Sequence, residues 1–148
     1  MENVYDIANW FLFRESMSNK KLQKMCYYAQ AWYAALYNKI LFRERIEAWV
    51  HGPVIPKLYN EYKSYGWDLI PSPKEQPSFC ENVEELLESV YLTYHDLTGY
   101  ELELLTHSED PWINARNGIG CLVPSNNSIS FEDMHNFYLK LYEEGQND

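Results

Sequence analysis

The side chains in this sequence that are best suited to chemistry are one cysteine and two histidines, Cys26, His51 and His107. A thiolate nucleophile needs a nearby imidazole, so these residues raise the hypothesis of a cysteine-dependent hydrolase. Cys26, however, lies on the apolar stripe of a predicted helix, where a buried thiol is the usual occupant. His51 ends a predicted strand before a turn, where a lone histidine more often makes a structural hydrogen bond. The hydrolase is therefore kept as an alternative, and we predict that the protein is not an enzyme.

Metal and nucleotide sites have no support in the spacing of the residues. The nearest metal-ligand candidates are the pair His95 and Asp96 and the run His107, Glu109 and Asp110, and neither has the offsets of H-E-x-x-H or C-x-x-C. We interpret the two acidic residues of the run as first-turn charges of a helix. The phosphate-binding glycine motifs and G-x-S-x-G are also absent from the sequence. We therefore expect no metal and no cofactor.

Charge and composition narrow the class of partner. The 148 residues carry 22 acidic and 12 basic side chains, for a formal charge of −10, which opposes binding to a phosphate backbone. The only basic cluster, Lys20, Lys21 and Lys24 in "NKKLQK", is interpreted as a solvent-exposed face. Three cysteines without a C-x-x-C pair suggest a reducing compartment, and neither a signal peptide nor an apolar run long enough for a membrane span is found. We expect a cytoplasmic protein that contacts neither nucleic acid nor membrane.

Helical spacing dominates the pattern of apolar residues, and it predicts about six helices. Capping signals at Ser18 or Asn19, Asn82, Thr98 and Ser130 mark several of the expected starts. The predicted helices cover 3–14, 18–36, 54–65, 82–94, 98–105 and 130–144, with a further short helix starting near 108. Between them, 67–81 holds three prolines and no periodicity, so it is predicted to be the longest loop, one that is either mobile or faces a partner.

A change of period separates a predicted strand from the third helix. Ile46, Ala48 and Val50 alternate with more polar or bulky residues, which predicts a short strand, with 41–42 as its candidate partner and Ile129 as a third strand. After Gly52 the helical period begins, which places Pro53 and Pro56 in the first turn of a helix. The predicted fold is mainly α (α+β): one compact bundle over 1–148 with a small two- or three-stranded antiparallel β element.

Three segments of the sequence are similar to one known family. They are "KLQKMCYYAQAWYAALYNKILF", "IEAWVHGPVIPKLYNEYKSYG" and "HSEDPW", and they lie in the family's order between about 18 and 115. The family that they resemble is the Panacea domain, which includes SocA-like antitoxins and phage-associated GepA-like proteins. The residues that carry the motif are Ala48, Trp49, Gly52, Pro53, Val54, Pro56, Tyr59, Pro111 and Trp112.

The resemblance implies a non-enzymatic task. It implies the antitoxin of a type II toxin–antitoxin system, which binds and neutralises a cognate toxin protein encoded by the adjacent gene. The alternatives are a proteolysis adaptor that delivers the toxin to a ClpXP-type protease, or a phage-associated protein that interacts with a host factor. Some relatives carry an added DNA-binding domain, for which this chain has no room, and this argues against autoregulation by DNA binding without deciding the chain's role in transcription. An acidic antitoxin suits a basic toxin.

The residues expected to contact the partner are aromatic or imidazole side chains near the motif, in the long loop and near the carboxyl terminus. They are Trp49, His51, Trp67, Trp112 and Tyr138. Around the junction we further expect Gly52 to be needed for the fold, because glycine permits a sharp turn, whereas His51 is dispensable for it.

Overall fold

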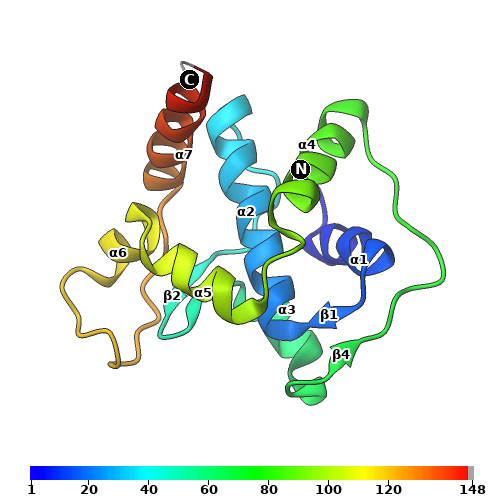
Figure 1. Cartoon of the computed structure of the whole chain (residues 1–148), viewed down its shortest axis with the longest axis horizontal. Helices are drawn as coiled ribbons and strands as arrows, with labels where there is room; N and C mark the ends of the chain where they lie inside the picture. The colour runs from blue at the N-terminus through cyan, green and yellow to red at the C-terminus, as the bar shows by residue number, and fades with distance from the viewer. Residues whose placement is uncertain (147–148) are drawn as a thin grey trace.

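The computed structural model describes residues 1–146, and its elements confirm a mainly α fold (Figure 1). The described residues form seven α-helices, one 3-10 helix and two small antiparallel sheets. The helices are α1 (Val4–Arg14), α2 (Asn19–Tyr37), α3 (Pro56–Tyr62), η1 (Lys63–Tyr65), α4 (Glu81–Tyr94), α5 (Gly99–His107), α6 (Asp110–Arg116) and α7 (Phe131–Gln146). The strands are β1 (Met17–Ser18), β2 (Glu47–Trp49), β3 (Gly52–Val54) and β4 (Leu69–Ile70).

Helix α2 is the central element of the molecule. It begins at the predicted cap, where the Ser18 hydroxyl accepts a hydrogen bond from the Lys21 backbone N–H, and it ends at Asn38 in the left-handed region. It packs against α1, α4, α5 and α7, and Figure 1 shows it between α7 and α4. Because neighbours surround it, even Lys21 and Lys24 are buried, so the predicted solvent-exposed lysine face is wrong for these two residues.

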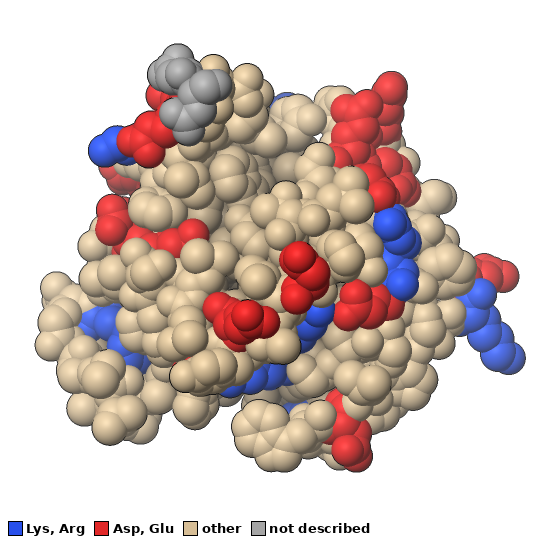
Figure 2. Space-filling view, in the orientation of Figure 1, with Lys and Arg blue, Asp and Glu red and all other residues tan. Residues whose placement is uncertain are grey.

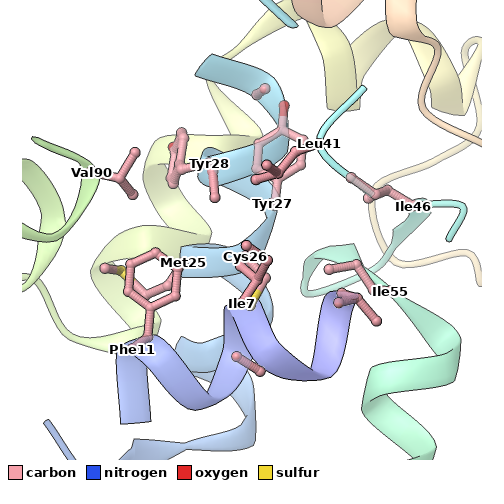
Figure 3. Close-up of a cluster of buried hydrophobic side chains, with 14 of the residues drawn as sticks. Ile7, Phe11, Met25, Cys26, Tyr27, Tyr28, Leu41, Ile46, Ile55 and Val90 are labelled. Atoms are coloured by element: carbon pink, nitrogen blue, oxygen red, sulfur yellow. The ribbon is translucent and has the colours of Figure 1, made fainter. Parts of the chain in front are cut away.

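The hydrophobic core is built where α1 crosses α2. Figure 3 shows Ile7 and Phe11 of α1 pointing toward Met25 and Cys26 of α2, and all four side chains are buried in one cluster. Burial also raises the pKa of the Cys26 thiol. A thiol with a raised pKa and no exposed surface is not a nucleophile at neutral pH, which supports the packing interpretation over the hydrolase.

The strand after 46 is one half of a hairpin, and its partner differs from the predicted one. Strand β2 pairs with β3, with Ala48 opposite Pro53 and Trp49 opposite Gly52. The predicted partner, 41–42, is instead fixed in the core by Gln30, whose side chain hydrogen-bonds the Leu41 N–H and the Phe42 carbonyl.

Pro53 therefore lies in a strand and not in the first turn of a helix, whereas Pro56 does begin α3 as predicted. The strand tolerates Pro53 because Ala48, the residue opposite, uses its backbone groups elsewhere: its N–H donates to the Asn127 carbonyl and its carbonyl accepts from Arg116. The predicted third strand is present as an isolated bridge between Glu47 and Ser128.

The helix caps were predicted with mixed success. Thr98 and Glu101 form the predicted capping box of α5, and the Ser130 hydroxyl accepts from the Asp133 N–H at the start of α7. The predicted cap Asn82 lies inside α4, which begins after Cys80. The pairing of β1 with β4, which anchors the start of the long loop, was not predicted.

Candidate functional site

A pocket of about 730 Å³ lies where the first turns of α2 meet the β2–β3 hairpin. We call it the hairpin pocket, and its volume is in the range typical of ligand sites. Its walls come from four segments of the chain: Asn19, Lys20, Gln23 and Lys24; Glu47, Trp49, Val50, His51 and Val54; Tyr59, Lys63, Gly66 and Trp67; and Pro124, Ser125 and Asn126.

Three of the five predicted partner-contacting residues meet at this pocket. Trp49 donates its indole N–H to Glu47 Oε1 at 2.8 Å and packs edge-on against Tyr59, with ring centroids 5.0 Å apart. His51 occupies the turn between the two strands. Trp67 follows η1 and is 82% exposed, an unusual state for the largest side chain. The pocket therefore has one fixed aromatic wall and one aromatic side chain that solvent reaches.

Two neighbouring residues of α2 connect the helix to the hairpin. The Gln23 side chain accepts a hydrogen bond from the Ile55 N–H at 2.9 Å, which fixes the chain between β3 and α3. Lys24 passes over Gly52, where a Cβ atom would lie 2.7 Å from Lys24 Cε. Gly52 also has a φ of +114°, which side chains rarely adopt, so glycine is required there on two grounds. The "KLQK" and "HGPV" motifs thus contact one another.

Lys24 is the most unusual ionisable group of the pocket. It is only 1% exposed, and its ammonium group makes no hydrogen bond or ion pair with residues 1–146. Burial, helped by the positive charge of Lys20, lowers the pKa of Lys24 to about 7, against the weaker opposing effect of Glu103. A charged lysine in this position lacks a counter-ion within the chain.

Glu103 of α5 is already engaged by two other side chains. Its Oε1 lies 2.5 Å from Lys20 Nζ and 3.2 Å from His51 Nδ1. Burial alone would raise the pKa of Glu103, but the hydrogen bonds from Lys20 and His51 outweigh it and lower that pKa. Glu103 therefore holds the hairpin turn to α2 and α5.

Trp112, the fourth predicted contact, supports the hairpin from behind. Its indole N–H donates to the Trp49 carbonyl at 2.8 Å, and its ring stacks on His107 at 4.0 Å. Trp112 is 6% exposed. The structure therefore removes it from the candidate contact surface and explains why "HSEDPW" accompanies the hairpin motif.

Tyr138, the fifth predicted contact, has no exposed surface and belongs to a second polar site. We call this site the tyrosine cluster, and its members are Tyr27, Tyr28, Trp32, Tyr94, Glu109 and Tyr138. Glu109 Oε1 accepts hydrogen bonds from Tyr28 at 2.7 Å and from Tyr138 at 2.8 Å. Tyr138 is therefore corrected to a core residue. Glu109 was predicted to be a charge in the first turn of a helix. It does precede α6, but it is buried and binds Tyr28 of α2 and Tyr138 of α7.

The charge of the hairpin pocket differs from that of the surface around it. Its walls carry three lysines and one histidine against one carboxylate, that of Glu47, in a chain of formal charge −10. In Figure 2, acidic side chains are spread over the face shown, including its lower right, and some of the basic ones lie beside a hollow in the lower part. The pocket is thus a locally basic and aromatic site in an acidic protein.

Sequence patterns missed Lys24, Gln23 and Lys63 as residues of the site. The available signal was the width of the apolar face of α2, because Tyr27, Tyr28 and Trp32 predict a helix buried on more than one side. A lysine inside such a helix has no exposed face to occupy.

Residues 1–146 contain neither a cluster of metal ligands nor a helix suited to crossing a membrane. No group of three or more histidine, cysteine or carboxylate side chains is placed to hold a metal ion within that range. No helix of the described residues has both the length and the apolar character that crossing a membrane requires.

Comparison with known proteins gives one match. The model of the family described as "Antitoxin SocA-like, Panacea domain" matches residues 22–113, which is more than half of the chain. This range includes Gln23, Lys24, Trp49, His51 and Trp67 of the hairpin pocket. No curated protein and no solved structure matches the chain.

Proposed function

The chain belongs to the family of SocA-like antitoxins with a Panacea domain, and from this premise we propose that it binds a cognate toxin protein directly and neutralises it, as in a type II toxin–antitoxin system. Membership of the family gives the protein an antitoxin-type role. Direct binding, the identity of the partner as a toxin and the surface used are our proposal.

The observation that carries the proposal is the convergence of the family motif on the hairpin pocket. A protein-binding surface typically has a few aromatic anchors in or beside a depression, with a polar rim. Trp49 and Trp67 are such anchors, and Lys63 and Asn126 supply polar groups beside them. We infer that the toxin covers this pocket and buries Trp67.

Charge supports the same proposal at longer range. Outside the pocket the chain is strongly acidic, and the field of a −10 protein attracts a basic partner and speeds its association. Toxins that act on RNA or nucleotides need basic surfaces, so an acidic antitoxin is complementary to them.

Co-expression with the product of the adjacent gene tests the function. We expect that product to arrest growth alone and to be harmless when this chain is present, and the two purified proteins to form a complex. A product that is harmless alone, or that remains toxic beside this chain, would refute the proposal.

The surface is tested by one aromatic truncation with two controls. Trp67→Ala should weaken toxin binding at least about tenfold, because an exposed aromatic anchor at an interface centre contributes about 2 kcal/mol or more. Tyr142→Ala on α7 and Leu92→Ala on α4 remove exposed apolar side chains away from the pocket and should change binding less than about twofold. A larger loss for Tyr142→Ala than for Trp67→Ala would move the interface to the carboxyl-terminal helix.

Delivery of the toxin to a ClpXP-type protease is the alternative mechanism. The half-life of the toxin in cells separates the two mechanisms. Direct neutralisation leaves the half-life unchanged when the protease is deleted, whereas an adaptor loses its protective effect in that strain.

A further inference from the structure

We propose that the hairpin pocket recognises a carboxylate attached to an apolar group, and that in the complex this carboxylate belongs to an acidic side chain of the toxin. The first half of this inference concerns the chemistry of the pocket alone. The second half, the source of the carboxylate, rests on the proposed function.

The unpaired ammonium group of Lys24 is the first argument. A buried charge without a partner is unfavourable by several kcal/mol, so proteins almost always pair it. Here Glu103 of α5, the carboxylate whose charge acts on Lys24, is already held by Lys20 and His51. Lys24 instead lies in the wall of a pocket that is open to solvent. A carboxylate that enters the pocket would supply the counter-ion that the chain itself lacks.

The construction around Lys24 is the second argument. The absence of a side chain at Gly52 leaves space for Lys24 beside the hairpin. A Cβ atom at position 52 would lie 2.7 Å from Lys24 Cε and 3.2 Å from Lys24 Nζ. Thr106 blocks the same position, with Oγ1 3.1 Å from the added Cβ. The fold therefore reserves a path for a lysine, although an apolar residue would fill the same buried position without an ionic penalty.

The remaining walls decide what carries the carboxylate. Trp49, Tyr59 and Trp67 present aromatic faces and Val54 an aliphatic one, so most of the lining is apolar. Such walls favour a ligand whose charged end is small and whose body is aliphatic or aromatic. The pocket volume of about 730 Å³ accommodates a side chain together with a neighbouring residue of a peptide.

A single negative charge suits the pocket better than a phosphate. Recognition of a phosphate usually recruits several donors, such as an arginine fork or a row of backbone N–H groups. The lining has no arginine, and the carboxylate of Glu47 in its wall opposes a dianion. Lys24 is the buried lysine of the lining without an ion-pair partner among residues 1–146, and one carboxylate is enough to pair it.

The acidic surface gives this arrangement a consequence for specificity. A basic toxin is attracted by the surface as a whole, but only a toxin with an acidic residue in the right place can also pair Lys24. A basic partner that lacks this residue would leave the lysine buried and unpaired, which disfavours the wrong complex.

Two dipeptides that differ only in charge test the pocket without any toxin. The probes are acetyl-Phe-Glu-amide and its neutral isostere acetyl-Phe-Gln-amide, titrated at pH 6 into the full chain with tryptophan fluorescence as the signal. We expect the glutamate probe to bind at least tenfold more tightly. We expect this preference to fall to less than twofold in Lys24→Met and in Lys24→Gln, and to persist in Lys39→Met, which removes an exposed charge beyond the other end of α2.

Several results would overturn the inference. Equal binding of the two probes, or a preference that persists in both Lys24 variants, would show that Lys24 does not recognise a carboxylate. Tighter binding of phenyl phosphate than of the glutamate probe would replace the carboxylate by a phosphate. The comparison of the two probes on the unmodified chain remains decisive even if a Lys24 variant does not fold.

Co-expression separates this inference from the proposed function. If the chain neutralises a toxin but prefers neither probe, the pocket inference fails and the antitoxin function stands. If the glutamate probe is preferred but no toxin is neutralised, the carboxylate pocket stands and the proposed function fails.

Discussion

The tyrosine cluster and the hairpin pocket both begin on α2, and each buries one side chain of an acidic or basic residue, Glu109 in the cluster and Lys24 in the pocket. In the tyrosine cluster, Glu109 accepts two hydrogen bonds, and Tyr138 in turn lies 2.9 Å from the Tyr27 hydroxyl. Because the one proton of Tyr138 is given to Glu109, Tyr27 must be the donor in the second contact. In the hairpin pocket, Lys24 has no such partner among the described residues.

The difference between the two sites indicates which one is built for a partner. A buried polar group whose hydrogen bonds are satisfied within the chain stabilises a unique packing and needs nothing from outside. A buried polar group without a partner, beside an open pocket, loses free energy until something pairs it. We therefore assign the tyrosine cluster to the fold and the hairpin pocket to binding.

The largest expected effect comes from closing the path of Lys24. Gly52→Val should destabilise the fold by at least about 3 kcal/mol, because the new side chain would overlap Lys24 and Thr106 at a φ of +114°. Urea unfolding followed by circular dichroism measures the change. A urea unfolding curve equal to that of the unmodified chain would contradict the account. His51→Ala is the control; its side chain is 70% exposed, and we expect a change within about 0.5 kcal/mol.

A smaller effect is expected in the tyrosine cluster, and it depends on the acceptor and not on the charge. Glu109→Ala should destabilise by about 2 to 4 kcal/mol, because the hydroxyls of Tyr28 and Tyr138 lose their acceptor inside the core. Glu109→Gln retains an acceptor oxygen and should lose less than half of that amount. Equal losses for the two variants in urea unfolding would show that the negative charge itself matters.

The two sites should also respond to pH with opposite signs. Burial lowers the pKa of Lys24 to about 7, so above pH 7 the unfolded chain binds more protons than the folded one. The stability of the chain relative to Lys24→Met should therefore rise with pH above 7, with a slope that approaches about 1.4 kcal/mol per pH unit by pH 9. The other titratable groups around Lys24 are Lys20, Glu103 and His107. They are present in both the unmodified chain and Lys24→Met, so their own titration largely cancels in the difference.

For Glu109 the sign is reversed. Burial raises the pKa of Glu109 more than the bonds from Tyr28 and Tyr138 lower it, so the folded chain holds this proton more strongly. Stability relative to Glu109→Gln should fall as the pH rises through the folded pKa of this carboxyl. Unfolding curves recorded over a series of pH values measure both effects. If the relative free energy of unfolding changes with pH in the same direction for both sites, the distinction between them fails.

The sequence predicted what depends on local pattern. The stripe of Leu22, Met25 and Ala29 on α2 and the capping box of Thr98 and Glu101 are read from neighbours three or four residues apart, and the structure confirms both. The match of 22–113 confirms the family that the motifs suggested.

What was missed depends on contacts between distant segments. Pro53 fits a strand only because Asn127 and Arg116 bind the backbone of the residue opposite, and neither contact has a local signal. Lys24 and Glu109 look like surface charges in the sequence, and they are buried because α5 and α7 cover them. Tyr138 was predicted at the surface for the same reason, since helical spacing does not show which aromatic residues of a rich set face inward.

Hydrogen exchange of the chain with and without its toxin tests the central claim most directly. We predict slower exchange of backbone amides in β2–β3, at 63–67 and at 125–126 when the toxin is bound, with little change in α7. Protection confined to α7 and the carboxyl-terminal half of α2, with the hairpin unchanged, would contradict the assignment of the hairpin pocket as the binding site.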